Sequence, residues 1–227
     1  METNSFLFAI MILVENQVKS KERVTEFGEV YTSQREVNAM LDLVKQETER
    51  LDSRFLEPAC GDGNFLIEVL NRKLEVLIKS HKKNQYEFEK NSVVVVGSIY
   101  GIDILEDNAQ IARDRLFNRF IEIYKKLFKD SINQNLVDSI KFIVENNILH
   151  GDALTLKKVD SDKPVVFSEW GAFNNKIKRR DFTLADLISY SPFEKGTLFS
   201  DMGDEVNIPE PIKEYPLVNF DKVFKTC

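Results

Sequence analysis

Residues 55–65 constrain the fold of this chain more than any other segment. They read Phe-Leu-Glu-Pro-Ala-Cys-Gly-Asp-Gly-Asn-Phe, so an apolar strand ends in an acid, turns through two glycines and enters a helix. Glycine tolerates positive φ and lets a ligand approach the backbone, and the helix that follows offers unpaired N–H groups at the positive end of its dipole. The segment therefore predicts an α/β unit with a cofactor-binding turn.

A second predicted strand, residues 100–104, carries one carboxylate, Asp103, at its carboxyl end. In open α/β sheets an acid at this place lies beside the first turn and accepts hydrogen bonds from a ribose diol. Position 66 is a leucine, so the first turn lacks the third glycine of a dinucleotide fingerprint. Asp103 alone could equally be a stray loop acid. However, Asp103 follows the first turn along the chain and precedes a third turn at 151–153. The three segments together favour an adenosine cofactor other than NAD.

Hydrophobic spacing along the chain predicts alternating helices and strands. Ser33 and Glu36 have the spacing of a capping box, so a helix should begin directly after Ser33. Residues 86–98 stay open between strand and helix, because their run of four valines has strand propensity. The other predicted elements are helices over 65–80, 105–128 and 133–145 and strands over 55–57, 100–104, 147–150 and 164–169. This β-α-β-α-β order predicts an α/β fold with a Rossmann-like, doubly wound and mostly parallel sheet.

Composition indicates one main domain with an extension at each end. With 227 residues, 43% of them hydrophobic, the chain can bury one α/β core. Five of the six prolines lie beyond Lys163, where hydrophobic periodicity thins. We therefore expect an N-terminal helical segment over 1–53, a core over 54–170 and an irregular C-terminal extension over 171–227.

Composition also argues against several kinds of site. The formal net charge of −6 gives no general attraction to nucleic acid, so such a contact needs a local patch or a partner subunit. Two distant cysteines and two histidines support neither a disulfide framework nor a metal site. The apolar run over 6–14 is shorter than the roughly 20 residues that span a membrane, and it lacks the features of a signal peptide. We expect a cytoplasmic protein with no membrane contact, whose translation could begin at Met11.

These motifs, in this order, resemble the cofactor-binding part of S-adenosylmethionine-dependent DNA methyltransferases, most of all the adenine-N6 modification subunits of restriction-modification systems. An upstream family segment of the type Gly-Glu-Val-Tyr-Thr-Pro is matched at 28–33, where Ser33 replaces the proline. The resemblance covers roughly residues 20–155. It implies the class I methyltransferase fold, S-adenosylmethionine as cofactor and DNA as partner, bound through a complex with another chain such as a specificity or nuclease subunit.

The resemblance also implies a set of cofactor-binding residues. Thr32 and its neighbours would contact the methionine carboxylate, Asp103 would hold the ribose hydroxyls, and Asp152 would receive the adenine amino group. The whole implied set is Tyr31, Thr32, Glu57, Pro58, Ala59, Gly61, Gly63, Asn64, Phe65, Asp103, Ile104, Asp152 and Ala153. Independently of the resemblance, a positively charged sulfonium suits a site with an acidic rim.

The part that would transfer the methyl group departs from the family pattern. Amino-directed enzymes place an Asn/Asp/Ser-Pro-Pro-aromatic tetrapeptide after strand four, where it accepts the amino hydrogens and stacks on the flipped base. Here residues 168–171 read Ser-Glu-Trp-Gly, and both prolines are missing. Ser168 and Trp170 could be remnants of the catalytic polar and aromatic members, or Trp170 could simply anchor the extension. We expect the isolated chain to transfer methyl groups poorly or not at all.

One basic run offers the local patch that a nucleic-acid contact would need. Lys176, Lys178, Arg179 and Arg180 could bind phosphates in a salt-dependent way, although a solvated basic turn is an equally good interpretation. Two alternatives to a DNA methyltransferase component also stay open. One is an inactive methyltransferase-fold scaffold or regulatory protein, and the less favoured one is a methyltransferase for a small molecule or a protein.

Overall fold

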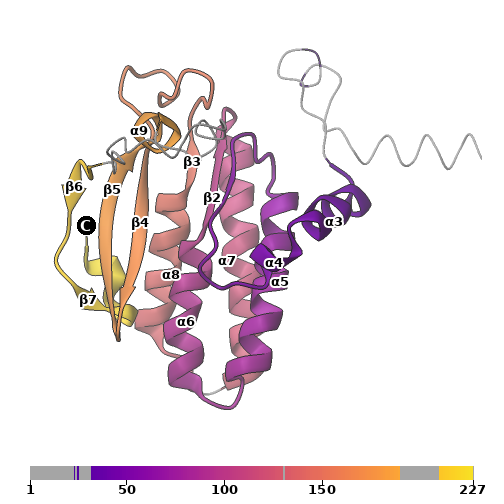
Figure 1. Cartoon of the computed structure of the whole chain (residues 1–227), viewed down its shortest axis with the longest axis vertical. Helices are drawn as coiled ribbons and strands as arrows, with labels where there is room; N and C mark the ends of the chain where they lie inside the picture. Colours follow the sequence, from indigo (N-terminus) through magenta and orange to yellow (C-terminus); the bar gives the residue numbers. More distant parts are fainter. Residues whose placement is uncertain (1–22, 24, 26–31, 130, 190–209, 227) are drawn as a thin grey trace, which may run out of the picture.

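The computed structural model describes residues 23, 25, 32–129, 131–189 and 210–226 (Figure 1). Tyr31, Met11 and the apolar run over 6–14 lie outside the described residues. Along the chain the elements are α3 (Gln34–Leu43), α4 (Lys45–Thr48), β1 (Phe55–Glu57), α5 (Asn64–His81), α6 (Gln85–Gly97), β2 (Ile99–Asp103), α7 (Glu106–Phe128), α8 (Gln134–Asn147), β3 (Ile148–His150), β4 (Val166–Phe173), β5 (Lys176–Thr183), α9 (Leu184–Ser189), β6 (Lys213–Glu214), β7 (Val218–Asn219) and the 3-10 helix η2 (Phe220–Lys225).

A parallel sheet in the order β1-β2-β3 forms the centre of the fold. Glu57 of β1 lies opposite Gly101 of β2, and Asp103 of β2 lies opposite His150 of β3. The carboxyl ends of all three strands therefore meet at one edge of the sheet. This confirms the predicted parallel order of the first three strands, and it places the turns that follow them side by side.

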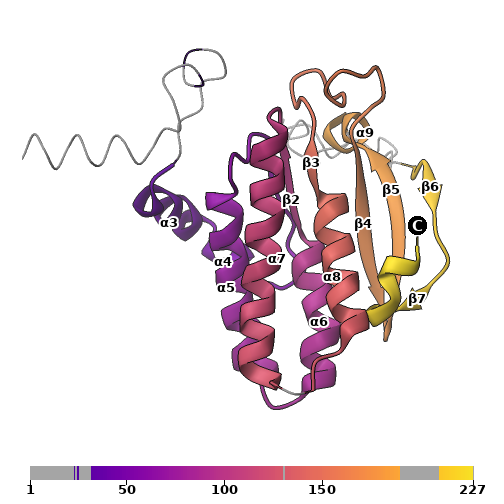
Figure 2. The same cartoon turned by 180° about the vertical axis from the view of Figure 1, so that it is seen from behind.

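The two faces of this sheet are covered differently. Successive residues of a strand point to opposite faces. On one face Ile99 belongs to the large core that it shares with α5, α6, α7 and α8, and these four helices lie together in both views of the cartoon (Figure 2). On the other face Tyr100 and Ile102 form a smaller cluster with Phe167 of β4 and residues beside it. The fold is thus mixed α/β with a parallel sheet, and the predicted doubly wound arrangement is not confirmed.

The fourth strand differs from its prediction. We expected 164–169 to continue the parallel sheet, but β4 pairs antiparallel with β5, from Val166 opposite Thr183 to Phe173 opposite Lys176. The hairpin belongs to a second sheet, in which β6 and β7 also pair with β5. The predicted irregular extension beyond residue 170 is therefore wrong for β5, because a regular eight-residue strand fills 176–183. The described part of 210–226 adds two short strands and η2.

The N-terminal helix has the cap that its sequence predicts. The Ser33 side chain accepts a hydrogen bond from the Glu36 N–H, and the Glu36 carboxylate accepts one from the Ser33 N–H, which completes the capping box. Val37 and Leu41 are buried, while Arg72 of α5 donates to Asn38 and so ties α3 to the core.

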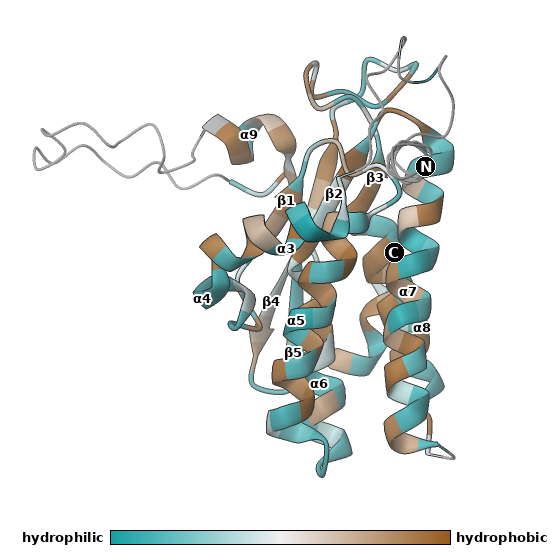
Figure 3. Cartoon of the chain, turned by 90° about the vertical axis from the view of Figure 1, so that its right-hand side faces the viewer, coloured by the Kyte–Doolittle hydropathy of each residue, from teal (hydrophilic) through white to brown (hydrophobic). Residues whose placement is uncertain are grey.

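The ambiguous valine segment is helical. Asn84 caps α6 by accepting a hydrogen bond from the Glu87 N–H, and this local signal outweighs the strand propensity of the valines. The long helices α5, α7 and α8 carry both hydrophilic and hydrophobic residues along their length (Figure 3). Within the described part of the chain, every helix is too short or too polar to cross a membrane.

Candidate cofactor site

The turn between β1 and α5 has the left-handed backbone that its glycines predict. Gly61 has a φ of 52° and Gly63 a φ of 85°, and the Gly63 N–H donates to the Cys60 carbonyl at 2.8 Å. A Cβ at Gly63 would lie 3.1 Å from the Cβ of Ala112 on α7, so a side chain here would be crowded as well as strained by the left-handed backbone. Gly63 is also the N-cap of α5 and provides no side-chain cap, which leaves the first N–H groups of the helix facing the turn.

Asp103 joins this turn to the end of β2. The Gly61 N–H donates to Asp103 Oδ2 at 2.8 Å, and the Leu105 N–H donates to Oδ1 at 2.9 Å. Asn108 of α7 adds a longer bond of 3.4 Å to Oδ1. Asp103 as a residue is only 7% exposed. One side chain thus fixes the spacing between the two turns that meet at the carboxyl edge of the sheet.

Glu57 is the last residue of β1 and lies beside this carboxylate, in surroundings that disfavour its ionised form. Its Oε2 atom is buried and has no hydrogen-bond partner in the described residues. Burial, together with the negative charges of Asp103 and Asp62, raises the pKa of Glu57 to about 8. A cationic ligand placed beside Glu57 would remove this penalty, because it would favour the ionised carboxylate.

Arg115 of α7 supports the turn from the other side. Its Nη1 donates to the Asp62 carbonyl at 2.8 Å and forms an ion pair of 2.8 Å with the Asp62 carboxylate. Its Nη2 donates to Asn64 Oδ1 at 2.9 Å. Sequence reasoning missed this residue, because no motif contains it and its approach to the turn depends on how α7 packs.

Asp152 takes part in a local turn next to the site. Its carboxylate accepts hydrogen bonds from the Leu154 N–H at 2.8 Å and from the Thr155 hydroxyl at 2.9 Å, and these bonds lower its pKa. Together with Ile104 it borders a hollow of about 290 Å³, whose other walls come from Thr155, Lys157, Lys158, Val159, Asp160 and Ser161. The hollow therefore lies directly after the strand that ends in Asp103.

The structure brings most of the predicted cofactor residues to one edge. Glu57, Gly61, Gly63 and Asp103 belong to the two joined turns described above, as does Asn64 through its bond to Arg115. The remaining members of the predicted set lie as follows: Pro58 and Ala59 are exposed in the first turn, Phe65 is half-buried in α5, Ala153 packs beside the β2 cluster, and Thr32 is exposed before α3. Their contact with a cofactor stays a prediction.

The two candidate catalytic residues are enclosed in the β4–β5 region. The Ser168 hydroxyl donates to Asp181 Oδ1 at 2.8 Å and accepts from Arg179 Nε at 3.1 Å. The Trp170 indole N–H donates to Asn147 Oδ1 at 2.9 Å. Ser168 is 3% exposed and Trp170 is 7% exposed. This placement supports the alternative in which Trp170 anchors the chain, and it speaks against direct contact of either residue with a substrate.

The basic run on β5 is largely neutralised by acids. Arg179 is buried and forms an ion pair with Asp181 at 2.9 Å, which speaks against a phosphate contact by its guanidinium. Lys178 pairs with Glu214 at 2.8 Å, and Arg180 pairs with Glu169. Lys176 is exposed at the end of the hairpin. A nucleic-acid role for Lys176, Lys178 and Arg180 stays a prediction.

The site lies in a mixed α/β domain, at the carboxyl edge of its parallel sheet. Its parallel sheet, two-glycine turn and carboxylate-closed second strand are compatible with a methyltransferase fold. A family model named for the DNA-methyltransferase domain of MmeI matches residues 30–164, more than half of the chain. The chain therefore belongs to the MmeI DNA-methyltransferase domain family, which confirms the resemblance to restriction-modification methyltransferases. Comparisons with curated proteins and with solved structures gave no match.

Proposed function

We propose that this chain is the S-adenosylmethionine-binding component of a DNA adenine-N6 methyltransferase in a restriction-modification or related defence system. The observation that carries the proposal is the hydrogen bond from the Gly61 N–H to the Asp103 carboxylate, which we call the Asp103 joint, with the unpartnered Glu57 oxygen beside it. Family membership supports the reaction class.

The residues present suit this cofactor chemically. S-adenosylmethionine supplies an electrophilic methyl group on a positively charged sulfur. Glu57 is a half-buried acid with one buried, unpartnered oxygen, and a cation beside it would stabilise its ionised form. Asp103 accepts two backbone hydrogen bonds and a longer one from Asn108, and a carboxylate has about four lone-pair directions, so about one remains for a ribose hydroxyl.

We further propose that the group that activates the target amine comes from elsewhere, from another polypeptide or from a segment outside 32–189. The burial of Ser168 and Trp170 supports this view, because an acceptor for amino hydrogens must be reachable by the base. DNA and a further subunit are accordingly the proposed partners. The same burial equally favours the alternative that the chain is a methyltransferase-fold scaffold that performs no transfer.

Isothermal titration calorimetry with S-adenosylmethionine tests the cofactor proposal. We expect micromolar binding by the wild type, lost in Asp103→Ala, because the variant removes both the ribose acceptor and the joint between the turns. Asp138→Ala on α8 is the matched control, since it removes a half-buried aspartate far from the two turns, whose carboxylate accepts a hydrogen bond from Gln134 one helical turn away. Wild-type protein that releases no heat at any temperature tested would refute the cofactor proposal.

An assay for transfer of tritiated methyl groups to adenine-containing DNA distinguishes a methyltransferase component from an inactive scaffold. We expect little or no transfer by the chain alone and transfer once the products of neighbouring genes are added. Transfer by the purified chain alone would contradict the proposed division of labour. Cofactor binding without transfer under any combination of subunits would favour the scaffold.

A further inference from the structure

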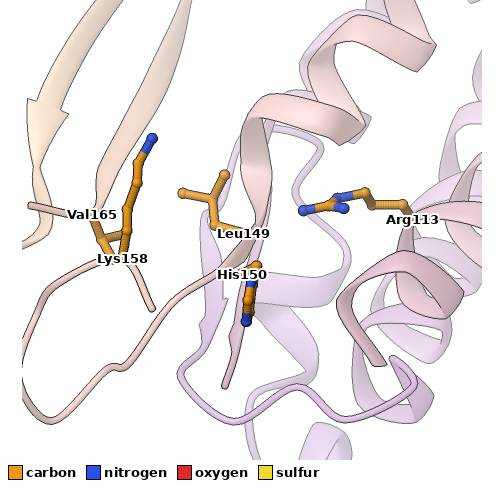
Figure 4. A pocket seen from close by; sticks show the side chains of 5 residues that line it. All are labelled: Arg113, Leu149, His150, Lys158 and Val165. Atoms are coloured by element: carbon orange, nitrogen blue, oxygen red, sulfur yellow. The ribbon is translucent and has the colours of Figure 1, made fainter. Parts of the chain in front are cut away.

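A hollow lies against β3, at the end of the sheet opposite β1. Because the sheet order is β1-β2-β3, β3 is an edge strand of the described sheet. The hollow has a volume of about 210 Å³, and its walls are Arg113, Leu149, His150, Lys158 and Val165 (Figure 4). Three of these five side chains are basic or can become so, on a chain whose formal net charge is −6.

The two permanent cations reach the hollow from different elements. Arg113 comes from α7, and its guanidinium points toward β3, while Lys158 comes from the loop on the opposite side of the strand (Figure 4). Arg113 Nε donates to the Ile148 carbonyl at 2.8 Å and Nη1 donates to Gln110 at 3.2 Å. Within the described residues neither cation pairs with a carboxylate, whereas the adjacent Lys157 pairs with Asp162 at 2.9 Å.

The hollow is connected to the cofactor site through the backbone. His150 lies opposite Asp103 in the sheet register, and its Nε2 is 3.1 Å from the carbonyl oxygen of Ile104, the residue that follows Asp103. Lys158 also borders the 290 Å³ hollow beside Asp152. A ligand in the β3 hollow would therefore lie at the carboxyl edge of the sheet, next to the place where a methyl acceptor must approach.

We propose that the β3 hollow holds the phosphodiester backbone of DNA. Two cations on opposite sides of one strand suit a chain of spaced negative charges better than a single small anion. The apolar side chains of Leu149 and Val165 between them suit the sugar portion of that backbone. This proposal rests on the proposed function, and it assigns the phosphate contact to residues that sequence reasoning did not consider, in place of the neutralised run on β5.

Fluorescence anisotropy with labelled duplex DNA, measured as a function of KCl concentration, tests the proposal. We expect Arg113→Gln and Lys158→Gln each to weaken binding about three- to tenfold at moderate salt and to reduce the slope of log K against log salt by about 0.9 per lost contact. Lys126→Gln is the matched control, because it removes one positive charge from the exposed far end of α7. Its slope should match that of the wild type.

Folding is measured on the same variants. Arg113→Gln loses a bond to β3 and could unfold, but Lys158 is exposed on a loop, so Lys158→Gln keeps the test informative. The heat of S-adenosylmethionine binding is measured on the wild type alongside: cofactor binding without DNA binding would overturn this proposal and leave the cofactor proposal standing. The proposal is overturned if the wild type does not bind DNA. It is also overturned if Lys158→Gln and Lys126→Gln weaken DNA binding to the same extent. Saturation of the hollow by inorganic phosphate with no effect on DNA binding would also overturn it, as a small-anion site.

Discussion

The substitution Glu57→Gln should stabilise the protein in a way that depends on pH. With an ordinary pKa of 4.5 raised to about 8, full linkage corresponds to about 5 kcal/mol of unfolding free energy. Because the side chain is half-buried and keeps some access to water, we expect about 2 to 3 kcal/mol. The cause is the ionised carboxylate, which the folded state disfavours and the unfolded state tolerates.

The sign of the effect follows from the two pKa values. Below pH 4.5 both states carry protonated Glu57, so the wild type and the variant should be equally stable. As the pH rises to about 8, the unfolded wild type loses its proton first, and the stability of the wild type falls while that of Glu57→Gln does not. Above pH 8 the difference between the two proteins should be constant.

Urea unfolding at pH 5, 7 and 9 measures this difference. Glu75→Gln on the exposed face of α5 controls for the loss of one negative charge. The reasoning is refuted if Glu57→Gln is no more stable than the wild type at pH 9, or if the gain is the same at pH 5. The same variant should bind S-adenosylmethionine more weakly than the wild type, since the cation would lose its buried counter-charge.

Three further predictions concern other parts of the fold. Gly63→Ala should cost about 1 to 3 kcal/mol in urea unfolding, because the backbone is left-handed and a Cβ would crowd Ala112; unchanged stability would show that neither effect matters. Arg115→Gln should raise the Kd for S-adenosylmethionine several-fold in calorimetry while the melting temperature changes by only a few degrees; an unchanged Kd would show that the turn needs no support from α7. Arg179→Met should destabilise by about 3 to 5 kcal/mol, because Asp181 would be left buried without its cation, and the double variant with Asp181→Leu should recover much of that loss; no recovery would mean that the pair is not the cause.

Local signals predicted the three parallel strands, the capped helix α3 and the backbone of the first turn. The capping box at Ser33, the glycines at 61 and 63 and the acid at 103 each act within a few residues of chain, and each has the predicted geometry. The 86–98 segment stayed ambiguous because valine favours strands, and the deciding Asn84 cap lies just outside it. Features that depend on residues close in sequence could therefore be predicted from the sequence.

The remaining features depend on partners distant in sequence. β4 has the composition of a buried parallel strand, but its hydrogen bonds go to β5, and nothing in 164–169 specifies that choice. Arg113 and Arg115 are two unremarkable positions of a long charged helix, and only the packing of α7 directs one to β3 and the other to the first turn. Ser168 and Trp170 could be identified as candidates, but their burial required the whole hairpin.

The Asp103 joint also affects the rate at which a ligand binds. Its carboxylate is already oriented by two backbone donors that belong to different loops, so neither loop needs to search for its position when a nucleoside arrives. Association with such a rigid receptor loses little conformational entropy on the protein side, and its rate should be set by diffusion and charge more than by rearrangement.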